Sequence, residues 1–257
     1  MRPRVIPVLL LDRRRRLVKT RSFGQPVYIG DPFNVMRIFN EKEVDEICVL
    51  DIDATEDGRE PDIGFLRELA NECFMPLAYG GGITSVAQCE ELMKSGIEKV
   101  VIGSAAAQGS LVREVSADFG SQAVCVCVDV KGSGTGATVV THHARRSQSA
   151  PPIEYARRVQ DQGAGEILLQ SVDRDGAREG YDLSLVGEIA HAVSIPVVAV
   201  GGAGTYAHLR DGLLAGASAV ASGSAFVFVG RLRGVLVSYP LGDELEGIFA
   251  PLTEPGS

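Results

Sequence analysis

The residue with the clearest potential for chemistry is Asp129, which ends the strand-like segment 123–129 (AVCVCVD). Alternation along a strand puts every second residue of this segment on one face. A carboxylate that points into the mouth of a barrel is a common general acid or base. We therefore predict that Asp129 is catalytic, against the alternative of a surface aspartate at a strand end. Two further carboxylates, Asp51 and Asp175, follow other strand-like segments and are predicted to bind substrate.

Small-residue turns follow several strand-like segments in both halves of the chain. Glycine lets a phosphate approach the backbone closely, and the N-terminus of a following helix offers free N–H groups and partial positive charge. Two sets of such turns suit an elongated substrate with a phosphate at each end, whereas the alternative is that the glycines only permit tight turns. The predicted phosphate-binding residues are Gly81, Gly82, Gly103, Ser104, Gly176, Gly201, Gly202, Gly223 and Ser224.

Four charged residues fall near the starts of strand-like segments: Arg4, Glu46, Lys99 and Glu166. A charge at a position prone to burial normally needs a partner, and two cations with two anions neutralise one another. One interpretation is a structural ring of ion pairs that closes the floor of a barrel, since that face usually serves stability. The functional interpretation is a gate through which a small neutral molecule enters an apolar barrel interior.

Eight strand-like segments alternate with eight helical patterns, which indicates parallel strands joined by helical crossovers. An open doubly wound sheet is the alternative, but the GxGxxG turn that such a sheet usually carries after its first strand is absent. We therefore predict a (β/α)₈ barrel. The predicted strands are 4–10, 46–51, 76–80, 98–103, 123–129, 165–171, 195–200 and 218–222. The predicted helices are 32–43, 61–74, 85–95, 108–119, 151–163, 182–193, 205–215 and 231–237.

An internal repeat favours the closed barrel. Segment 46–50 (EICVL) is similar to 166–170 (EILLQ), and 78–82 (AYGGG) is similar to 199–203 (AVGGA). We predict one barrel domain over residues 1–257, with half-barrels at about 1–120 and 121–240 and a tail at 241–257 of no assigned role. Segments 17–30 and 131–149 are longer than a connection between a barrel strand and its helix requires. We expect a hairpin in the first and a short strand in the second. Long loops after barrel strands often carry function.

The composition excludes several classes of protein. A net charge of −8 gives no general basic field for nucleic acid. The run Arg13-Arg14-Arg15-Arg16 is either a solvated loop or an anion site. The five cysteines include no CxxC pair, so neither disulfides nor a zinc site is expected. No signal peptide or membrane-spanning run is recognisable, and we expect a cytoplasmic enzyme without metal or other cofactor.

Several motifs together resemble the cyclase subunit of imidazole glycerol phosphate synthase, the HisF family. They include Gly163–Leu169 (GAGEILL), Asp173–Gly176 (DRDG) and Ser194–Val197 (SIPV), and the resemblance covers about residues 1–237. It implies a barrel that receives ammonia from a glutaminase subunit docked at its floor and passes it through a four-residue charged gate to a doubly phosphorylated substrate. The gate positions are those of Arg4, Glu46, Lys99 and Glu166.

One departure from the family concerns Leu10. The resemblance implies two catalytic aspartates; Asp129 matches the second, but Leu10 stands where the first is expected, with Asp12 two residues further on. Segments 7–11 and 17–20 look like the WbuZ-type relatives of surface-polysaccharide sugar amidation. Our first hypothesis is therefore a subunit that supplies ammonia for amidation of a nucleotide sugar, beside a sugar amidotransferase. The alternatives are the cyclase of histidine biosynthesis and a non-catalytic ammonia conduit and docking module.

Overall fold

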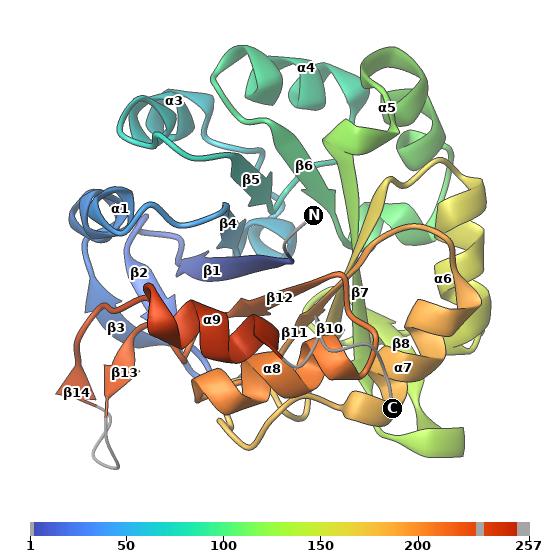
Figure 1. Cartoon of the computed structure of the whole chain (residues 1–257). Helices are drawn as coiled ribbons and strands as arrows, with labels where there is room; N and C mark the ends of the chain where they lie inside the picture. Colours follow the sequence, from blue (N-terminus) through green and yellow to red (C-terminus); the bar gives the residue numbers. More distant parts are fainter. Residues whose placement is uncertain (1–2, 230–233, 251–257) are drawn as a thin grey trace.

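The computed structural model describes residues 3–229 and 234–250 and contains a closed barrel of eight parallel strands (Figure 1). Each strand pairs with two neighbours, and the last barrel strand pairs back with the first. The prediction of a (β/α)₈ barrel is confirmed, and the open sheet is excluded. In pairing order the barrel strands are β1 (Arg4–Leu11), β4 (Ile47–Asp51), β5 (Leu77–Gly80), β6 (Lys99–Ile102), β7 (Val124–Lys131), β10 (Glu166–Ser171), β11 (Val197–Val200) and β12 (Ala219–Ser222).

Helices surround the barrel, and local sequence signals explain where they begin. Asp31 caps α1 by accepting from the N–H of Asn34, and Pro32 occupies its first turn. Ser85 and Gln88 form a capping box at α4. The helices are α1 (Pro32–Glu41), α2 (Ala54–Asp57), α3 (Ile63–Asn71), α4 (Val86–Lys94), α5 (Leu111–Phe119), α6 (Pro152–Asp161), α7 (Leu183–Ala192), α8 (Tyr206–Leu214) and α9 (Asp243–Phe249). Short 3₁₀ turns are η1 (Ser104–Ala107), η2 (Ser121–Ala123) and η3 (Gly134–Gly136). No described helix has the length and apolar character needed to cross a lipid bilayer.

The barrel separates two apolar cores. The larger core lies between the strands and the helices and includes Phe39, Leu69 and Tyr155, all nearly inaccessible to solvent. The smaller core fills the barrel interior with inward-facing side chains such as Ile6, Val101 and Leu168. Because strand residues alternate between the two faces, a single strand contributes to both cores. Only the inward-facing residues at the carboxyl ends of the strands can therefore reach the mouth of the barrel.

Two hairpins extend from the carboxyl ends of barrel strands. In the segment 17–30, β2 (Leu17–Lys19) pairs with β3 (Val27–Gly30), as expected from the sequence. In the segment 131–149, β8 (Thr138–Thr141) pairs with both β7 and β9 (Arg146–Ser147). The expected short strand is therefore present as part of a hairpin. The carboxyl end of a barrel is the face at which active sites are built.

The predicted helix over 231–237 is wrong where the structure describes it. Gly234–Val235 forms β14, which pairs antiparallel with β13 (Phe228–Val229), whereas residues 231–233 lie outside the described residues. The apolar spacing of this segment suggested a helix, but Gly234 is a poor helix former and the local strand pairing prevails. The tail contains the unexpected α9, which packs beside α8 and buries Ile248 (Figure 1). The half-barrel repeat stays a prediction.

Candidate functional site

Two adjoining cavities open at the carboxyl ends of the barrel strands. The larger has a volume of about 730 Å³, and the smaller is a narrow cleft. Leu10, Thr20, Gln170 and Asp175 line both of them. Because these four residues line both cavities, the cavities lie side by side and together form an elongated site.

The structure gathers the predicted site residues around these cavities. The larger cavity is lined by Asp51, Gly81, Gly82, Gly103, Ser104 and Asp129. The narrow cleft is lined by Gly176, Gly201, Gly202, Gly223 and Ser224. The two predicted sets of phosphate-binding residues thus lie in two different cavities, with Asp175 between them. Their roles stay predictions.

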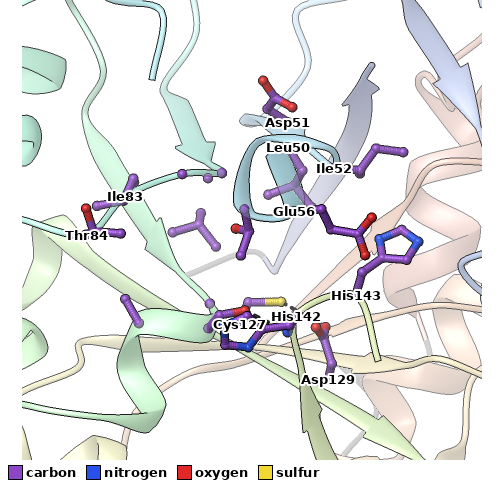
Figure 2. A pocket seen from close by; sticks show the side chains of 18 of the residues that line it. Leu50, Asp51, Ile52, Glu56, Ile83, Thr84, Cys127, Asp129, His142 and His143 are labelled. Carbon is purple, nitrogen blue, oxygen red and sulfur yellow. Dashed lines mark hydrogen bonds between the residues drawn. The ribbon is translucent and has the colours of Figure 1, made fainter. Parts of the chain in front are cut away.

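Asp129 lies inside the larger cavity, beside Cys127 (Figure 2). The thiol of Cys127 donates a hydrogen bond of 3.2 Å to Oδ1 of Asp129. Burial raises the pKa of Asp129 from 3.8 to about 6, with a contribution from the nearby charge of Asp175, while Cys127 and His143 oppose the rise. A carboxyl group that titrates close to neutral pH can both give and take a proton.

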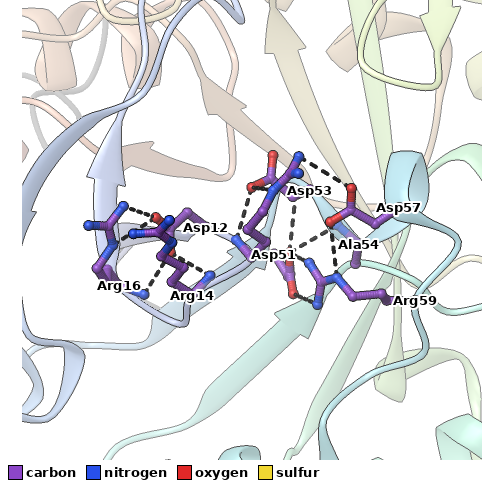
Figure 3. Close-up of polar contacts among 9 residues, drawn as sticks. Asp12, Arg14, Arg16, Asp51, Asp53, Ala54, Asp57 and Arg59 are labelled. Atoms are coloured by element: carbon purple, nitrogen blue, oxygen red, sulfur yellow. Dashed lines mark hydrogen bonds and ion pairs between the residues drawn. The ribbon is translucent and has the colours of Figure 1, made fainter.

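Asp51 and Asp175 differ in how far their carboxylates are engaged. Asp51 receives two hydrogen bonds of 3.1 Å from Arg59, and it also accepts the backbone N–H groups of Asp53 and Ala54 (Figure 3). Figure 2 shows its carboxylate turned away from the cavity. Among the described residues, Asp175 accepts one side-chain hydrogen bond, of 3.1 Å from Thr20, and burial raises its pKa. Asp175 is therefore the better placed of the two to meet a substrate.

The glycines of the predicted phosphate turns are required by the turns themselves. Gly82 and Gly202 have φ angles of 69° and 116°. A Cβ atom on Gly82 would lie 2.3 Å from the carbonyl oxygen of Arg59, and one on Gly202 would lie 2.1 Å from that of Gly180. Neighbouring backbone thus approaches these two glycines closely, which is what the alternative interpretation of the glycines as tight-turn residues predicts. The turn after β5 leads into α4, and the turn after β11 leads into α8. The turn after β12 leads into the strand β13, where a helix was expected.

Lys19 is a candidate binding residue that the sequence analysis did not identify. Its side chain is buried in the narrow cleft, and Nζ donates a hydrogen bond of 2.7 Å to the carbonyl oxygen of Val8. Burial lowers its pKa to about 8, opposed by the charge of Asp175. A Cβ atom on Gly223 would lie 2.6 Å from this Nζ, so glycine leaves room for the ammonium group. The only signal in the sequence is a lysine directly after the apolar pair Leu17-Val18.

Leu10 and Asp12, the two residues at which the sequence departs from the expected pair of aspartates, lie in different surroundings. Leu10 lines both cavities as an apolar side chain. Asp12 is buried, but its carboxylate accepts hydrogen bonds from the backbone of Arg14 and from the backbone and guanidinium of Arg16 (Figure 3). Asp12 is not among the residues that line either cavity. These contacts hold Asp12 in the turn before β2, outside both cavities.

The basic run is an ion-paired loop. Arg13 pairs with Asp53 and Asp57, and Arg16 pairs with Asp12. Arg15 pairs with Asp62. Carboxylates from the neighbouring loop therefore compensate most of this positive charge. The solvated-loop interpretation holds over an anion site.

The four gate candidates meet at the opposite end of the barrel. Nζ of Lys99 lies 3.0 Å from Glu46 and 2.7 Å from Glu166, and Arg4 pairs with the same two carboxylates. Burial alone lowers the pKa of Lys99, but the charges of Glu166 and Glu46 outweigh it and the pKa is raised. The two glutamates are only 5% and 6% exposed. The result is a compensated ring of alternating charge across the floor.

An apolar interior joins this ring to the larger cavity. Above the charged ring, the barrel is filled by small and branched side chains that include Ile6, Cys48 and Cys125. Leu50 and Cys127 pack on this core and also line the larger cavity. Burial raises the pKa of all three of these cysteines, so the interior is uncharged. In residues 3–229 and 234–250, no three His, Cys, Asp or Glu side chains group in a way that could hold a metal ion.

Comparisons with known proteins identify the family. The chain matches the model of the family described as "Histidine biosynthesis protein" over residues 4–232. It is 47% identical over 249 residues to the "Putative imidazole glycerol phosphate synthase subunit hisF2" of Pseudomonas aeruginosa, covering 96% of this chain and 99% of that protein. A protein of Leptospira borgpetersenii with the corresponding name, subunit HisF, is 41% identical over 97% of this chain and 99% of its own length.

A third relative, subunit hisF3 of Vibrio vulnificus, is 42% identical over 95% of both chains. The resemblance to the cyclase subunit is thus confirmed at the level of the family, whereas none of these comparisons supports a link to the WbuZ-type relatives. The chain belongs to the histidine biosynthesis protein family, among relatives named as subunits of imidazole glycerol phosphate synthase.

Proposed function

We propose that this chain is an ammonia-dependent synthase subunit of the imidazole glycerol phosphate synthase type. Ammonia enters through the ring of Arg4, Glu46, Lys99 and Glu166 and crosses the barrel interior to the larger cavity. There it reacts with a phosphorylated substrate beside Asp129. The observation that carries the proposal is the continuous apolar interior between a compensated charged ring and a cavity that contains an acid/base carboxyl group.

The elongated site supports a substrate with two phosphates. In this proposal one phosphate is bound at the Gly81-Gly82 turn and Ser104, and the other at Gly201-Gly202 and Ser224, where the ammonium group of Lys19 adds a positive charge. Asp175 lies between these two subsites and is placed to contact the middle of the substrate. This assignment gives each cavity one end of the ligand.

A glutaminase subunit is the proposed partner at the barrel floor. We assign the charged ring to contact with this partner, because a gate for ammonia has a function only if a source of ammonia covers it. A network of four charges with two buried carboxylates costs desolvation energy that a simple apolar floor would avoid. We infer that the network is retained for passage as well as for stability.

The substrate remains the point on which our hypotheses differ. The relatives are named for imidazole glycerol phosphate synthase, which favours the cyclase alternative over our first hypothesis of nucleotide-sugar amidation. Amidation is motivated by Leu10, an apolar side chain in the cavity where a carboxylate is expected, together with the complete set of gate residues. In the third hypothesis the chain is a conduit, and Asp129 has no role.

The test is turnover of the doubly phosphorylated nucleotide substrate of imidazole glycerol phosphate synthase by the purified chain with ammonium chloride. Formation of the imidazole product supports the proposal. If ammonium supports no turnover, but a glutaminase and a sugar amidotransferase together with this chain amidate a nucleotide sugar from glutamine, the amidation hypothesis replaces it. If the chain only stimulates the glutaminase, the conduit hypothesis replaces it.

A further inference from the structure

Addition of ammonia to a carbon atom requires two proton movements, and so far only Asp129 has been assigned to them, while Asp175 has been assigned to substrate contact. The attacking nitrogen must lose a proton, while the oxygen that it displaces must gain one. Asp129 can serve one of these steps. Asp51 is held by Arg59, Asp12 is held in a turn, and Leu10 cannot transfer a proton.

His143 lies in the same cavity as Asp129. It stands in the turn between β8 and β9, and Figure 2 shows its ring above Asp129 and next to Glu56. His143, Asp129 and Asp175 all line the larger cavity, so the imidazole and the two carboxyl groups face one shared space. The β8–β9 hairpin thus brings a proton-transfer group to the carboxylate from a segment that is 14 residues further along the chain.

A second hairpin fixes the tautomer of this histidine. Nε2 of His143 lies 2.8 Å from the backbone carbonyl oxygen of Phe23, and the two rings are in contact with centroids 5.1 Å apart. A carbonyl oxygen only accepts hydrogen bonds, so Nε2 must carry the proton. The lone pair of the neutral ring is then on Nδ1, which has no hydrogen-bond partner among the described residues. A neutral imidazole with an available Nδ1 is a general base.

The hairpin itself is anchored at both sides of His143. The backbone N–H of His142 donates a hydrogen bond of 2.9 Å to the hydroxyl of Ser104, and Arg145 forms an ion pair of 2.9 Å with Glu56. These contacts join the turn to η1 and α2 across the larger cavity. His143 is therefore held in position by contacts that do not involve its own Nδ1.

We propose that His143 is the second proton-transfer group of this site, acting through Nδ1 opposite Asp129. The inference rests on the proposed function, in which ammonia is the nucleophile. As ammonia adds to a substrate carbonyl, the N–C bond forms and the protonated Asp129 gives its proton to the carbonyl oxygen, while Nδ1 of His143 takes a proton from the nitrogen. The imidazolium then protonates the hydroxyl, which leaves as water. Asp129 takes one of the two protons of the iminium nitrogen, which leaves the neutral imine, and both groups return to their starting states.

The charged groups that face His143 define the pH dependence. Asp129 faces it from β7, Asp175 from the loop after β10 and Glu56 from α2; Glu56 is compensated by Arg145 of the same hairpin. Two interacting groups that must share one proton give a bell-shaped dependence of kcat/KM on pH. Removal of one group leaves a profile with a single ionisation.

The variant His143→Gln tests the inference, since its amide N–H still reaches toward the Phe23 carbonyl but has no proton to exchange. With ammonium chloride and the doubly phosphorylated substrate, we expect kcat to fall by about 10²-fold or more, as for loss of a general base. The KM should change little, and the bell-shaped profile should lose one limb. The control is His191→Gln, because His191 is exposed on α7 and bonds only its own helix.

The outcomes separate the two proposals. A wild-type chain without ammonium-dependent turnover overturns the proposed function and this inference with it. An active wild-type chain whose His143→Gln variant keeps kcat and the bell-shaped profile overturns the inference alone. A rise in KM at unchanged kcat would also overturn it, because His143 would then only hold the hairpin. The double variant Leu10→Asp/His143→Gln should regain part of the lost kcat by supplying a carboxylate to the same cavity.

Discussion

The thiol of Cys127 donates a hydrogen bond to the carboxyl group of Asp129, two residues along the same strand. Strand alternation places both side chains inside the barrel, one at the top of the apolar interior and the other in the cavity above it. A thiol is a weak donor, so it orients the carboxyl group without holding it in the ionised form. The pKa of about 6 therefore reflects burial more than hydrogen bonding.

Replacement of Asp129 by Asn should abolish most ammonium-dependent turnover. The amide keeps the shape of the carboxyl group but cannot exchange a proton, so we expect a loss of about 10²–10⁴-fold in kcat. Steady-state kinetics with saturating ammonium chloride measures the effect. Asp118→Asn, an exposed position on α5, is the control. Full activity of Asp129→Asn would support the conduit hypothesis.

The same substitution should stabilise the protein at neutral pH. The folded pKa of Asp129 is raised from 3.8 to about 6, so the folded state binds more protons than the unfolded state between these values. Stability is thus lost as the pH rises through this window, by up to roughly 3 kcal/mol at about 1.4 kcal/mol per pKa unit. Asp129→Asn removes that cost. Urea unfolding should show a higher unfolding free energy than wild type at pH 7.5 but not at pH 4; equal differences at both pH values would contradict the prediction.

Lys99→Met should uncouple the two sources of ammonia. The substitution leaves Glu46 and Glu166 with Arg4 as their only cation in the ring, which changes both the charge of the floor and its packing. We expect turnover from glutamine, with the glutaminase present, to fall strongly, while turnover from added ammonium chloride is retained. Unfolding free energy should drop by roughly 1–3 kcal/mol, because two buried carboxylates lose a partner.

Lys94→Met is the matched control for the gate, since Lys94 forms ion pairs with Glu90 and Glu91 on the exposed surface of α4. It should leave both activities and the stability close to wild type, because water and salt screen ion pairs on an exposed surface. Loss of both activities in Lys99→Met, with the fold intact, would argue against a passage at this ring.

Binding of the phosphorylated substrate should weaken above pH 8. Burial lowers the pKa of Lys19 to about 8, so its ammonium group loses its charge as the pH rises through that value. We expect KM for the substrate to increase by up to about tenfold between pH 7 and pH 9, in proportion to the loss of the cation. KM of Lys19→Met should be high at both pH values and nearly independent of pH. A wild-type KM that is constant across this range would exclude Lys19 from the phosphate subsite.

The sequence predicted the barrel well, because strands that are buried on both faces read as short apolar runs and the helices carry recognisable start signals. β7, for example, was predicted at 123–129 and extends over Val124–Lys131. The region after β12 was predicted poorly: residues such as Gly234 and Val235 pair with a local strand, and apolar spacing alone does not reveal such pairing.

The predicted site residues gather at the two mouths because alternation and strand position decide on which face a residue lies. Lys19 and His143 were missed for a different reason. Each lies on a hairpin, and its surroundings depend on which other segment the hairpin meets: the carbonyl oxygen of Val8 in β1 for Lys19, and that of Phe23 in the β2–β3 turn for His143. Contacts between loops distant in sequence have no local signature.

The wall shared by the two cavities has a consequence for inhibition. Leu10, Thr20, Gln170 and Asp175 line both cavities and so lie between the two proposed phosphate subsites. Two small monophosphates would therefore occupy the site together and not compete, whereas a single molecule of matching length that bears both groups gains the advantage of bivalency. Spacer length, more than the chemistry of either end, then sets the potency of such a compound.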